Sequence, residues 1–293
     1  MRSRIVTARE SGASRTPGAK GLCPDRNHVV AGSPACAGDP TLADAIIPHE
    51  IPRPQAGYRF AVRSDASELS VAGVTLMADL AGALYWPDER LMVVSDLHLE
   101  KGSSFARRGV LLPPYDTAST LERLAGTLSR HPVRTVIALG DSFHDQDGPA
   151  RLTAADRARL LELQRGRDWV WIAGNHDPDP PDRPGGVFVT SLGLWPLSFR
   201  HEPTPQAQPG EIAGHLHPVA RVSGRGQIVT RRCFVSDGGR VVMPAFGAYT
   251  GGLNIRHAAF AEAFGTLAFT AHLLGQRRLY TFAAAQCFAG VAP

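Results

Sequence analysis

The stretch Leu91-Met-Val-Val-Ser-Asp96-Leu-His98 joins a short apolar run directly to an acidic residue and a histidine. Two later stretches repeat this arrangement: Thr135–Leu139 runs into Gly140-Asp141, and Asp168–Ala173 runs into Gly174-Asn-His-Asp177. Apolar runs of about five residues that stop abruptly at polar residues are typical of buried strands. The sequence therefore predicts three buried strands, each followed at its carboxyl end by polar side chains.

The segments between these strands have helical periodicity. Tyr115–Arg130 carries leucines at helical spacing, and Thr153–Gln164 opens with Thr153-Ala-Ala-Asp156, which is close to a capping box. Alternating strands and helices predict an α/β unit with a largely parallel sheet. Because ligands bind beyond the carboxyl ends of such strands, the polar clusters predict a binding site there.

After Asp177 the pattern changes to short strands separated by Gly and Pro turns. The expected strands are Val187–Thr190, Leu194–Arg200, Glu211–Ala213, Ile228–Val235 and Arg240–Pro244. Asp237-Gly-Gly239 is a plausible hairpin turn between the last two.

The composition indicates an ordinary soluble protein. The 293 residues are 43% apolar and 20% charged, which is enough apolar material for a real core. The sequence has no run of about 18 apolar residues, so no membrane association is expected, and Met1–Leu22 has no signal-peptide pattern. We therefore expect a cytoplasmic protein. The net charge of +4 is too small to decide whether the partner is a nucleic acid.

Histidines gather in the polar clusters. Six of the 11 histidines fall there, namely His98, His144, His176, His201, His215 and His217. The four cysteines lack the paired spacing of a zinc site. Carboxylate, imidazole and amide ligands without thiolates favour divalent manganese, iron or zinc, and a pair of such ions suits phosphoester hydrolysis.

The order D-x-H, G-D-x-x-H, G-N-H-D, H, G-H-x-H resembles the calcineurin-like metallophosphoesterase superfamily. Three stretches, Ser95–Gly109, Leu111–Thr117 and Pro244–Gly252, resemble more narrowly the bacterial ligase-associated DNA damage response endonucleases. The resemblance covers roughly residues 71 to 254. It implies an α/β fold, a four-layer β-sandwich flanked by helices, in which the strand-rich second half shares one domain with the first.

The superfamily resemblance also implies roles for individual residues. One metal ion would be held by Asp96, His98 and His217, the other by Asn175, His201 and His215, with Asp141 bridging both. The catalytic residues would be His176 on the leaving oxygen, Asp177 orienting it, and His144 near the scissile phosphate. The cofactor expected is a pair of Mn²⁺ ions, with iron or zinc as alternatives.

The expected domain comprises residues 58–293. Residues 1–57 lack any sustained periodicity and predict a disordered N-terminal extension, or a start codon placed too far upstream.

Basic and hydroxyl side chains on two segments could bind substrate phosphates. Lys101, Ser103, Arg107 and Arg108 follow the first metal motif, and Arg231 and Arg232 belong to an arginine-rich strip after the last. A solvated loop or strand face would look the same. Four acidic residues, Asp145, Asp147, Asp179 and Asp182, count against a polyanionic substrate unless cations offset them.

Three functions remain open at this point. The first is a two-metal phosphodiesterase cutting DNA, and the resemblance implies that it works with an ATP-dependent DNA ligase, a helicase and a second nuclease. The second is a phosphoesterase for a nucleotide, a lipid pyrophosphate or a phosphoprotein, since lipid-A-pathway pyrophosphatases share the Ser-Asp-Leu-His-Leu opening. The third is a non-catalytic scaffold, which the complete set of metal motifs disfavours.

Overall fold

The computed structural model describes residues 66–180, 182–205, 208–224 and 227–289. The predicted extension over residues 1–57 and the expected domain start at residue 58 lie outside this part of the chain. No helix among the described residues is long and apolar enough to cross a membrane.

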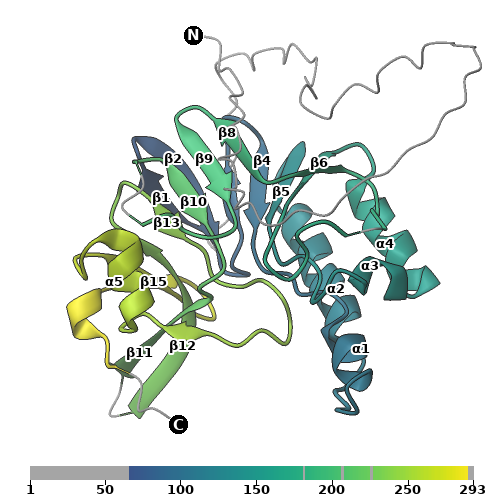
Figure 1. Ribbon diagram of the computed structural model, residues 1–293. Helices are drawn as coiled ribbons and strands as arrows, with labels where there is room; N and C mark the ends of the chain where they lie inside the picture. The colour runs from purple at the N-terminus through teal and green to yellow at the C-terminus, as the bar shows by residue number, and fades with distance from the viewer. Residues whose placement is uncertain (1–65, 181, 206–207, 225–226, 290–293) are drawn as a thin grey trace, which may run out of the picture. The chain divides into compact units, whose positions relative to one another are not determined.

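The three strands predicted from the apolar runs lie side by side in the first sheet (Figure 1). Its strands, in spatial order, are β1 (Ala66–Val71), β2 (Val74–Asp79), β3 (Leu84–Trp86), β4 (Leu91–Val94), β5 (Thr135–Leu139), β6 (Asp168–Ile172) and β7 (Val187–Val189). β1 to β4 pair antiparallel, whereas β4 to β7 pair parallel. The parallel half is the α/β unit that the sequence predicts, and its carboxyl ends share one edge.

Helices α2 (Asp116–Leu128) and α4 (Ala154–Gln164) cover the outer face of this sheet (Figure 1). The short helices α1 (Lys101–Ala106) and α3 (Gly148–Arg151) contact each other, and α1 also contacts α2. α4 begins where the sequence predicts, since the Thr153 side chain accepts a hydrogen bond from the Asp156 backbone N–H at 3.1 Å. α2 buries Leu121, Leu124 and Leu128, the residues at helical spacing, against the sheet.

The second sheet contains the strands of the carboxyl-terminal half. Its main order is β14 (Leu253–Asn254), β11 (Pro218–Gly224), β12 (Gln227–Ser236), β13 (Val241–Val242), β10 (Glu211–Ala213), β9 (Leu197–Arg200) and β8 (Ser191–Leu194), with β15 (Thr270–Leu274) and β16 (Leu279–Ala283) joined through β12. The prediction of a single strand over Leu194–Arg200 is wrong at its first residues. Residues 191–200 form an antiparallel hairpin instead, because Trp195-Pro196 occupies its turn and proline has no N–H for a ladder.

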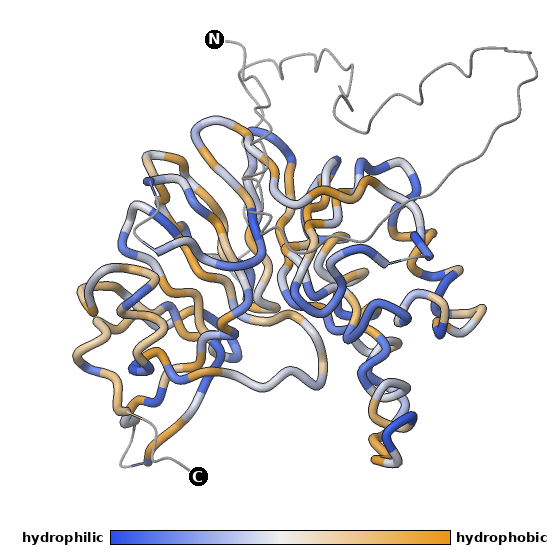
Figure 2. The backbone as a smooth tube through the Cα atoms, viewed as in Figure 1, coloured by the Kyte–Doolittle hydropathy of each residue, from blue (hydrophilic) through white to orange (hydrophobic). Residues whose placement is uncertain are grey.

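Three apolar clusters define the layers. The two sheets pack on each other through residues such as Ile137, Phe199 and Phe234. The first sheet packs on α2 and α4 through a second cluster, and the second sheet packs on α5 (Ala258–Phe264) through a third, so that Figure 2 shows hydrophobic colour along the inner strands. Helix, sheet, sheet, helix is the four-layer α/β sandwich that was expected.

A buried ion pair fastens α2 to the first sheet. The carboxylate of Asp79, 2% exposed, accepts hydrogen bonds from Arg130 Nη2 at 2.7 Å and Nε at 3.0 Å. Burial alone would raise the pKa of Asp79, but hydrogen bonds from His131 and Arg130 outweigh it and hold that pKa below its usual value. We expect Arg130→Met to lower the free energy of unfolding by about 3 kcal/mol, since it takes the guanidinium away from a buried carboxylate and leaves it only His131 and the Ala81 N–H as partners among the described residues. Urea denaturation at pH 7 measures this change.

The same pair predicts a pH dependence. An acid whose pKa is lowered by folding stabilises the protein above its unfolded pKa, about 3.9, and this stabilisation is lost as the pH falls. The difference in stability between wild type and Arg130→Met should therefore shrink below about pH 4. Arg165→Met, which removes an exposed pair with Glu162, is the matched control and should cost less than about 1 kcal/mol. An equal difference at pH 3 and pH 7 would contradict this assignment.

Candidate metal centre

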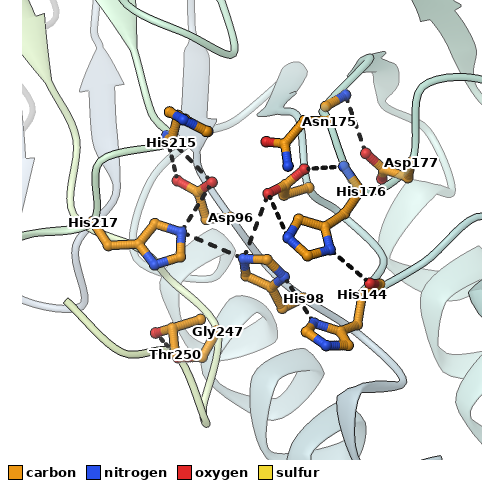
Figure 3. A network of polar contacts seen from close by, with 12 residues as sticks. Asp96, His98, His144, Asn175, His176, Asp177, His215, His217, Gly247 and Thr250 are labelled. Carbon is orange, nitrogen blue, oxygen red and sulfur yellow. Dashed lines mark hydrogen bonds and ion pairs between the residues drawn. The ribbon is translucent and has the colours of Figure 1, made fainter. Parts of the chain in front are cut away.

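The polar clusters meet at the carboxyl ends of strands from both sheets (Figure 3). Asp96 and His98 follow β4, Asp141 follows β5, and Asn175 and His176 follow β6. From the second sheet, His201 follows β9, and His215 and His217 follow β10. Because β4, β5 and β6 run parallel, and so do β9 and β10, their loops emerge at neighbouring edges.

Asp96, His98 and His217 form a first group of potential ligands, with one atom from each lying within 4.8 Å of the others. His217 Nε2 lies 3.2 Å from Asp96 Oδ1 and 3.4 Å from His98 Nε2. Asp96 and His98 are buried, and His217 is half-buried.

Asp141, His201 and His215 form the second group, with the same spacing. His201 Nδ1 donates to the Leu139 carbonyl at 2.9 Å, so its Nε2 carries the lone pair that faces the group. That Nε2 lies 3.4 Å from Asp141 Oδ1, 3.1 Å from His215 Nδ1 and 2.9 Å from Asn175 Oδ1.

Asp141 stands between the two groups. Its Oδ2 lies 3.7 Å from His98 Nε2 in the first group, while its Oδ1 faces His201 in the second. The structure thus brings together all seven side chains expected as ligands, in the two sets expected, with Asp141 at their junction.

The backbone of the centre is held in a costly conformation. Eight non-glycine residues in the described part of the chain have positive φ, and five of them are Asp96, His98, Asp141, His215 and His217, with φ between 43° and 66°. Such residues are uncommon and persist only where surrounding structure enforces them. Asp141 Oδ1 supplies one such restraint by accepting from the His176 N–H at 2.9 Å.

Burial keeps part of the centre in the form that binds cations. Burial, together with the positive charge that neighbouring histidines would carry, lowers the pKa of His98 to about 3, so its imidazole is neutral at pH 7. Burial opposes the charged form of His217 as well, but the hydrogen bond and charge of Asp96 raise the pKa of His217. A bound cation would take over the role of that proton.

The donor set fits two divalent cations. Each group offers one carboxylate and two imidazoles, and Asn175 adds an amide oxygen to the second. Imidazole nitrogens facing one another at 3.1 and 3.4 Å cannot all donate, and a cation between them would satisfy their lone pairs. Neither group includes a cysteine.

His176 and His144 lie beside the two groups. The His176 side chain is 40% exposed, and its Nε2 lies 3.9 Å from Asp141 Oδ2. Its Nδ1 contacts the His144 carbonyl oxygen at 2.9 Å, and the two rings stack with centroids 5.1 Å apart. His144 Nδ1 also lies 3.3 Å from His98 Nδ1.

Asp177 does not orient His176, contrary to the expectation. Its Oδ1 accepts from the Gly174 N–H at 3.1 Å and its Oδ2 from the Phe143 N–H at 3.0 Å. Burial, and then the nearby Asp141 carboxylate, raise the pKa of Asp177 to about 7 against these hydrogen bonds. Asp177 therefore joins two metal loops, and the His144 carbonyl holds the His176 ring.

A hollow of about 560 Å³ opens beside the centre. Asn175 and His176 line it together with Arg107 and Arg108 from the end of α1. The four acidic residues that counted against a polyanion are each paired with an arginine: Asp145 with Arg151, Asp147 with Arg107, Asp179 with Arg183 and Asp182 with Arg157. Their negative charge is therefore offset locally.

The other four residues that were expected to bind substrate phosphates make hydrogen bonds within the protein. Lys101 Nζ donates to the Tyr249 carbonyl at 2.8 Å, and Ser103 Oγ donates to Glu100 Oε2 at 2.7 Å. Arg232 is half-buried and donates to the Ala245 carbonyl at 2.7 Å, whereas Arg231 is exposed on β12 and bonds its neighbour Thr230. None of these four lines the 560 Å³ hollow.

Sequence reasoning missed two supporting groups. Arg151 binds Asp145 through two nitrogens, at 2.7 and 2.8 Å, and also reaches Ser103. The loop after β13 closes on the first metal loop, where the Gly247 N–H donates to the Asp96 carbonyl at 3.1 Å. The glycine-rich run Gly247–Gly252 was the available signal for such close backbone contact.

Gly174 lies where two metal loops approach each other closely. A Cβ at this position would lie 2.1 Å from the Asp141 backbone nitrogen and 2.2 Å from its Oδ1. We expect Gly174→Ala to lower kcat/KM by about 100-fold, since the added methyl group would displace Asp141, and a displacement of a catalytic group by about 1 Å has an effect of that size. Gly126→Ala is the matched control, because Gly126 is exposed on α2, a Cβ there would meet only Arg130 Nη1 at 4.0 Å, and the substitution should instead stabilise by about 1 kcal/mol. Steady-state kinetics on a soluble diester measure both variants. Wild-type rates in Gly174→Ala as well as in Gly126→Ala would contradict this prediction.

Fold and site together define a class of protein. Two packed sheets carry paired carboxylate and imidazole groups at the ends of parallel strands, which is the arrangement of a metal-dependent phosphoester hydrolase. Residues 89–243 match the model of the calcineurin-like phosphoesterase family. The chain belongs to that family.

Known proteins that are similar to it include a nuclease and a phosphodiesterase. The crystal structure of Pseudomonas putida nuclease MPE superposes with a TM-score of 0.59 at 30% sequence identity, over 74% of this chain and 100% of that one. The 3′,5′-cyclic adenosine monophosphate phosphodiesterase CpdA of Pseudomonas aeruginosa is 30% identical over 128 residues, which is 42% of this chain. The match spans only 44% of the length of CpdA.

Proposed function

We propose that the protein is a two-metal phosphodiesterase that cleaves DNA. The observation that carries this proposal is a single hollow beside the metal centre. Asn175 and His176 of the centre line this hollow together with the positively charged side chains of Arg107 and Arg108. An enzyme that cleaves a phosphodiester backbone needs a hydrolytic centre, and it also needs positively charged side chains that bind the flanking phosphates. The similarity to the nuclease from P. putida supports the same substrate.

In this proposal, the seven side chains hold two divalent cations, with Mn²⁺ as the preferred ion and iron or zinc as alternatives. The bound pair would supply Lewis-acid activation of a water and neutralise charge on the phosphoryl oxygens. Asp141 contributes one carboxylate oxygen to each group, and Asp96 completes the first.

His176 is the residue proposed to protonate the leaving oxygen. Hydrolysis breaks one P–O bond, and the departing alkoxide needs a proton. In its imidazolium form, His176 donates from Nδ1 to the His144 carbonyl and keeps its Nε2–H directed toward the centre. His144, stacked on that ring, fixes its plane.

The charges around the hollow suit a polyanion. Arg107 is shared with Asp147 across 3.1 Å, whereas Arg108 has no carboxylate partner among the described ion pairs. A strand bound by such exposed cations should dissociate more readily as salt rises.

Substrate assays test this proposal. With Mn²⁺, the protein should hydrolyse bis-p-nitrophenyl phosphate much faster than the p-nitrophenyl monoester, and it should linearise circular single-stranded DNA. Parallel assays with iron, zinc and magnesium rank the metals. Equal rates on diester and monoester, or intact circles under conditions where the diester is hydrolysed, would contradict a DNA phosphodiesterase.

A second candidate is a cyclic nucleotide phosphodiesterase, which the similarity to CpdA favours. The same centre could hydrolyse the cyclic diester of a nucleotide. Cyclic AMP turnover faster than oligonucleotide cleavage would select this function.

We also propose a setting for the DNA-cleaving activity. The protein would act in the cytoplasm with an ATP-dependent DNA ligase, a helicase and a second nuclease in one repair system. A gene for such a ligase in the same operon, and greater DNA damage sensitivity after deletion, would support this setting.

A further inference from the structure

A second hollow, of about 440 Å³, lies against α1. Its lining is mostly apolar and comprises Lys101, Phe105, Leu112, Pro113 and Tyr249. Lys101 and Phe105 are four residues apart and share one face of α1, whereas Ser104 on the next face and Arg108 in the turn after α1 line the hollow of the metal centre. The two hollows therefore flank the same short helix.

Aromatic contacts connect this second hollow to the metal centre. The Phe105 ring lies with its centroid 5.4 Å from that of His144, which in turn lies 5.4 Å from His98 and 5.1 Å from His176. The opposite wall is also joined to the centre, because Tyr249 follows Gly247, whose N–H donates to the Asp96 carbonyl. Lys101 holds the two walls together through the Tyr249 carbonyl.

Cations surround the aromatic ring of this hollow. Lys101 Nζ lies 5.8 Å and the Arg108 guanidinium 5.9 Å from the Phe105 ring centroid. The loop after α1 adds exposed apolar side chains, with Val110 49%, Leu111 86% and Tyr115 65% exposed, and Figure 2 marks the tip of this loop as hydrophobic. An apolar surface bordered by positive charge beside a phosphoester site fits a ligand with a flat apolar part and an anionic part.

We propose that this hollow binds a nucleobase of the substrate strand, stacked on the aromatic side chains of Phe105 and Tyr249, while a neighbouring phosphate occupies the metal centre. The inference rests on the proposed DNA-cleaving function and adds to it a site for the base. Every base has a π-face that stacks on aromatic residues. A base can enter the hollow only after leaving its partner strand, so the site favours unpaired nucleotides at the cleavage point.

Two oligonucleotides test the proposal with Mn²⁺ present. One is a ten-nucleotide oligothymidylate, and the other has the same backbone with base-free tetrahydrofuran residues. We expect wild type to cleave the first with a kcat/KM about tenfold higher or more, mainly through KM. Phe105→Leu keeps apolar bulk but removes the ring, and it should lower this ratio at least about fivefold. Tyr280→Ala removes an exposed aromatic side chain on β16 and should leave the ratio unchanged.

The outcomes separate this proposal from the proposed function. Cleavage of both oligonucleotides at equal rates by wild type would overturn the base site and leave the phosphodiesterase standing. A proportional loss on both substrates in Phe105→Leu would mean a structural role and would also overturn it. If the protein cleaves neither oligonucleotide, both the DNA-cleaving function and the base site are overturned. Faster turnover of a diacyl pyrophospholipid, without a base preference, would assign the hollow to an acyl chain instead.

Discussion

Replacing Asp141 with alanine should reduce kcat/KM on a diester by at least about 10⁴-fold. The Asp141 side chain faces both groups, with Oδ2 3.7 Å from His98 Nε2 and Oδ1 3.4 Å from His201 Nε2. Its removal takes a ligand from each proposed cation, and losing several kcal/mol of charge stabilisation in the transition state corresponds to a factor of this size. Steady-state kinetics at saturating Mn²⁺ measure the loss.

Two controls make that result specific. Asp88→Ala removes an exposed carboxylate from a turn between β3 and β4 and should keep wild-type kinetics. Circular dichroism should show that Asp141→Ala retains its fold, because the two sheets pack through a separate apolar cluster. A folded Asp141→Ala protein with more than a tenth of the wild-type rate would remove the basis for a shared metal site.

Replacing His176 with alanine should lower kcat by about 10²- to 10⁴-fold while metal binding persists. His176 is not a member of either ligand group, and its exposed ring lines the hollow of the centre. Metal content by mass spectrometry and kcat, measured on the same preparation, separate proton transfer from metal binding.

The choice of leaving group sharpens the test of His176. A diester with a p-nitrophenolate leaving group needs little protonation, whereas an alkoxide needs a full proton, so His176→Ala should slow the alkyl ester far more. His131→Ala is a suitable control, since His131 stacks on Tyr85 with centroids 4.5 Å apart, away from the centre. An equal loss on both esters would argue against His176 as the acid.

The sequence was sufficient to predict the half of the fold that carries most of the site. β4, β5 and β6 are short runs that are apolar except for Thr135 and Asp168 at the starts of β5 and β6, and each ends just before a metal motif begins. The antiparallel strands β1 to β3 were not predicted, because their residues interleave with turns at Ala72-Gly73 and Ala81-Gly82 and lack a continuous apolar run. α5, with seven residues, is too short for its periodicity to show.

The family resemblance predicted which side chains gather at the centre better than it predicted the supporting contacts. Carboxylate and imidazole are the groups that such metal ions prefer, so Asp96, Asp141 and the histidines could be proposed as ligands without coordinates. The partner of a side chain depends on tertiary geometry: Asp177 follows His176 in the chain but binds the N–H groups of Gly174 and Phe143. Arg232 likewise lies in a basic strip, yet it is half-buried and holds the Ala245 carbonyl.

Anomalous diffraction from crystals grown with Mn²⁺ tests the central claim most directly. The account predicts two manganese peaks per chain, one bounded by Asp96, His98 and His217 and the other by Asn175, His201 and His215, with Asp141 in contact with both. Active protein whose crystals show no peak beside Asp141, or a single peak that Asp141 does not touch, would contradict it.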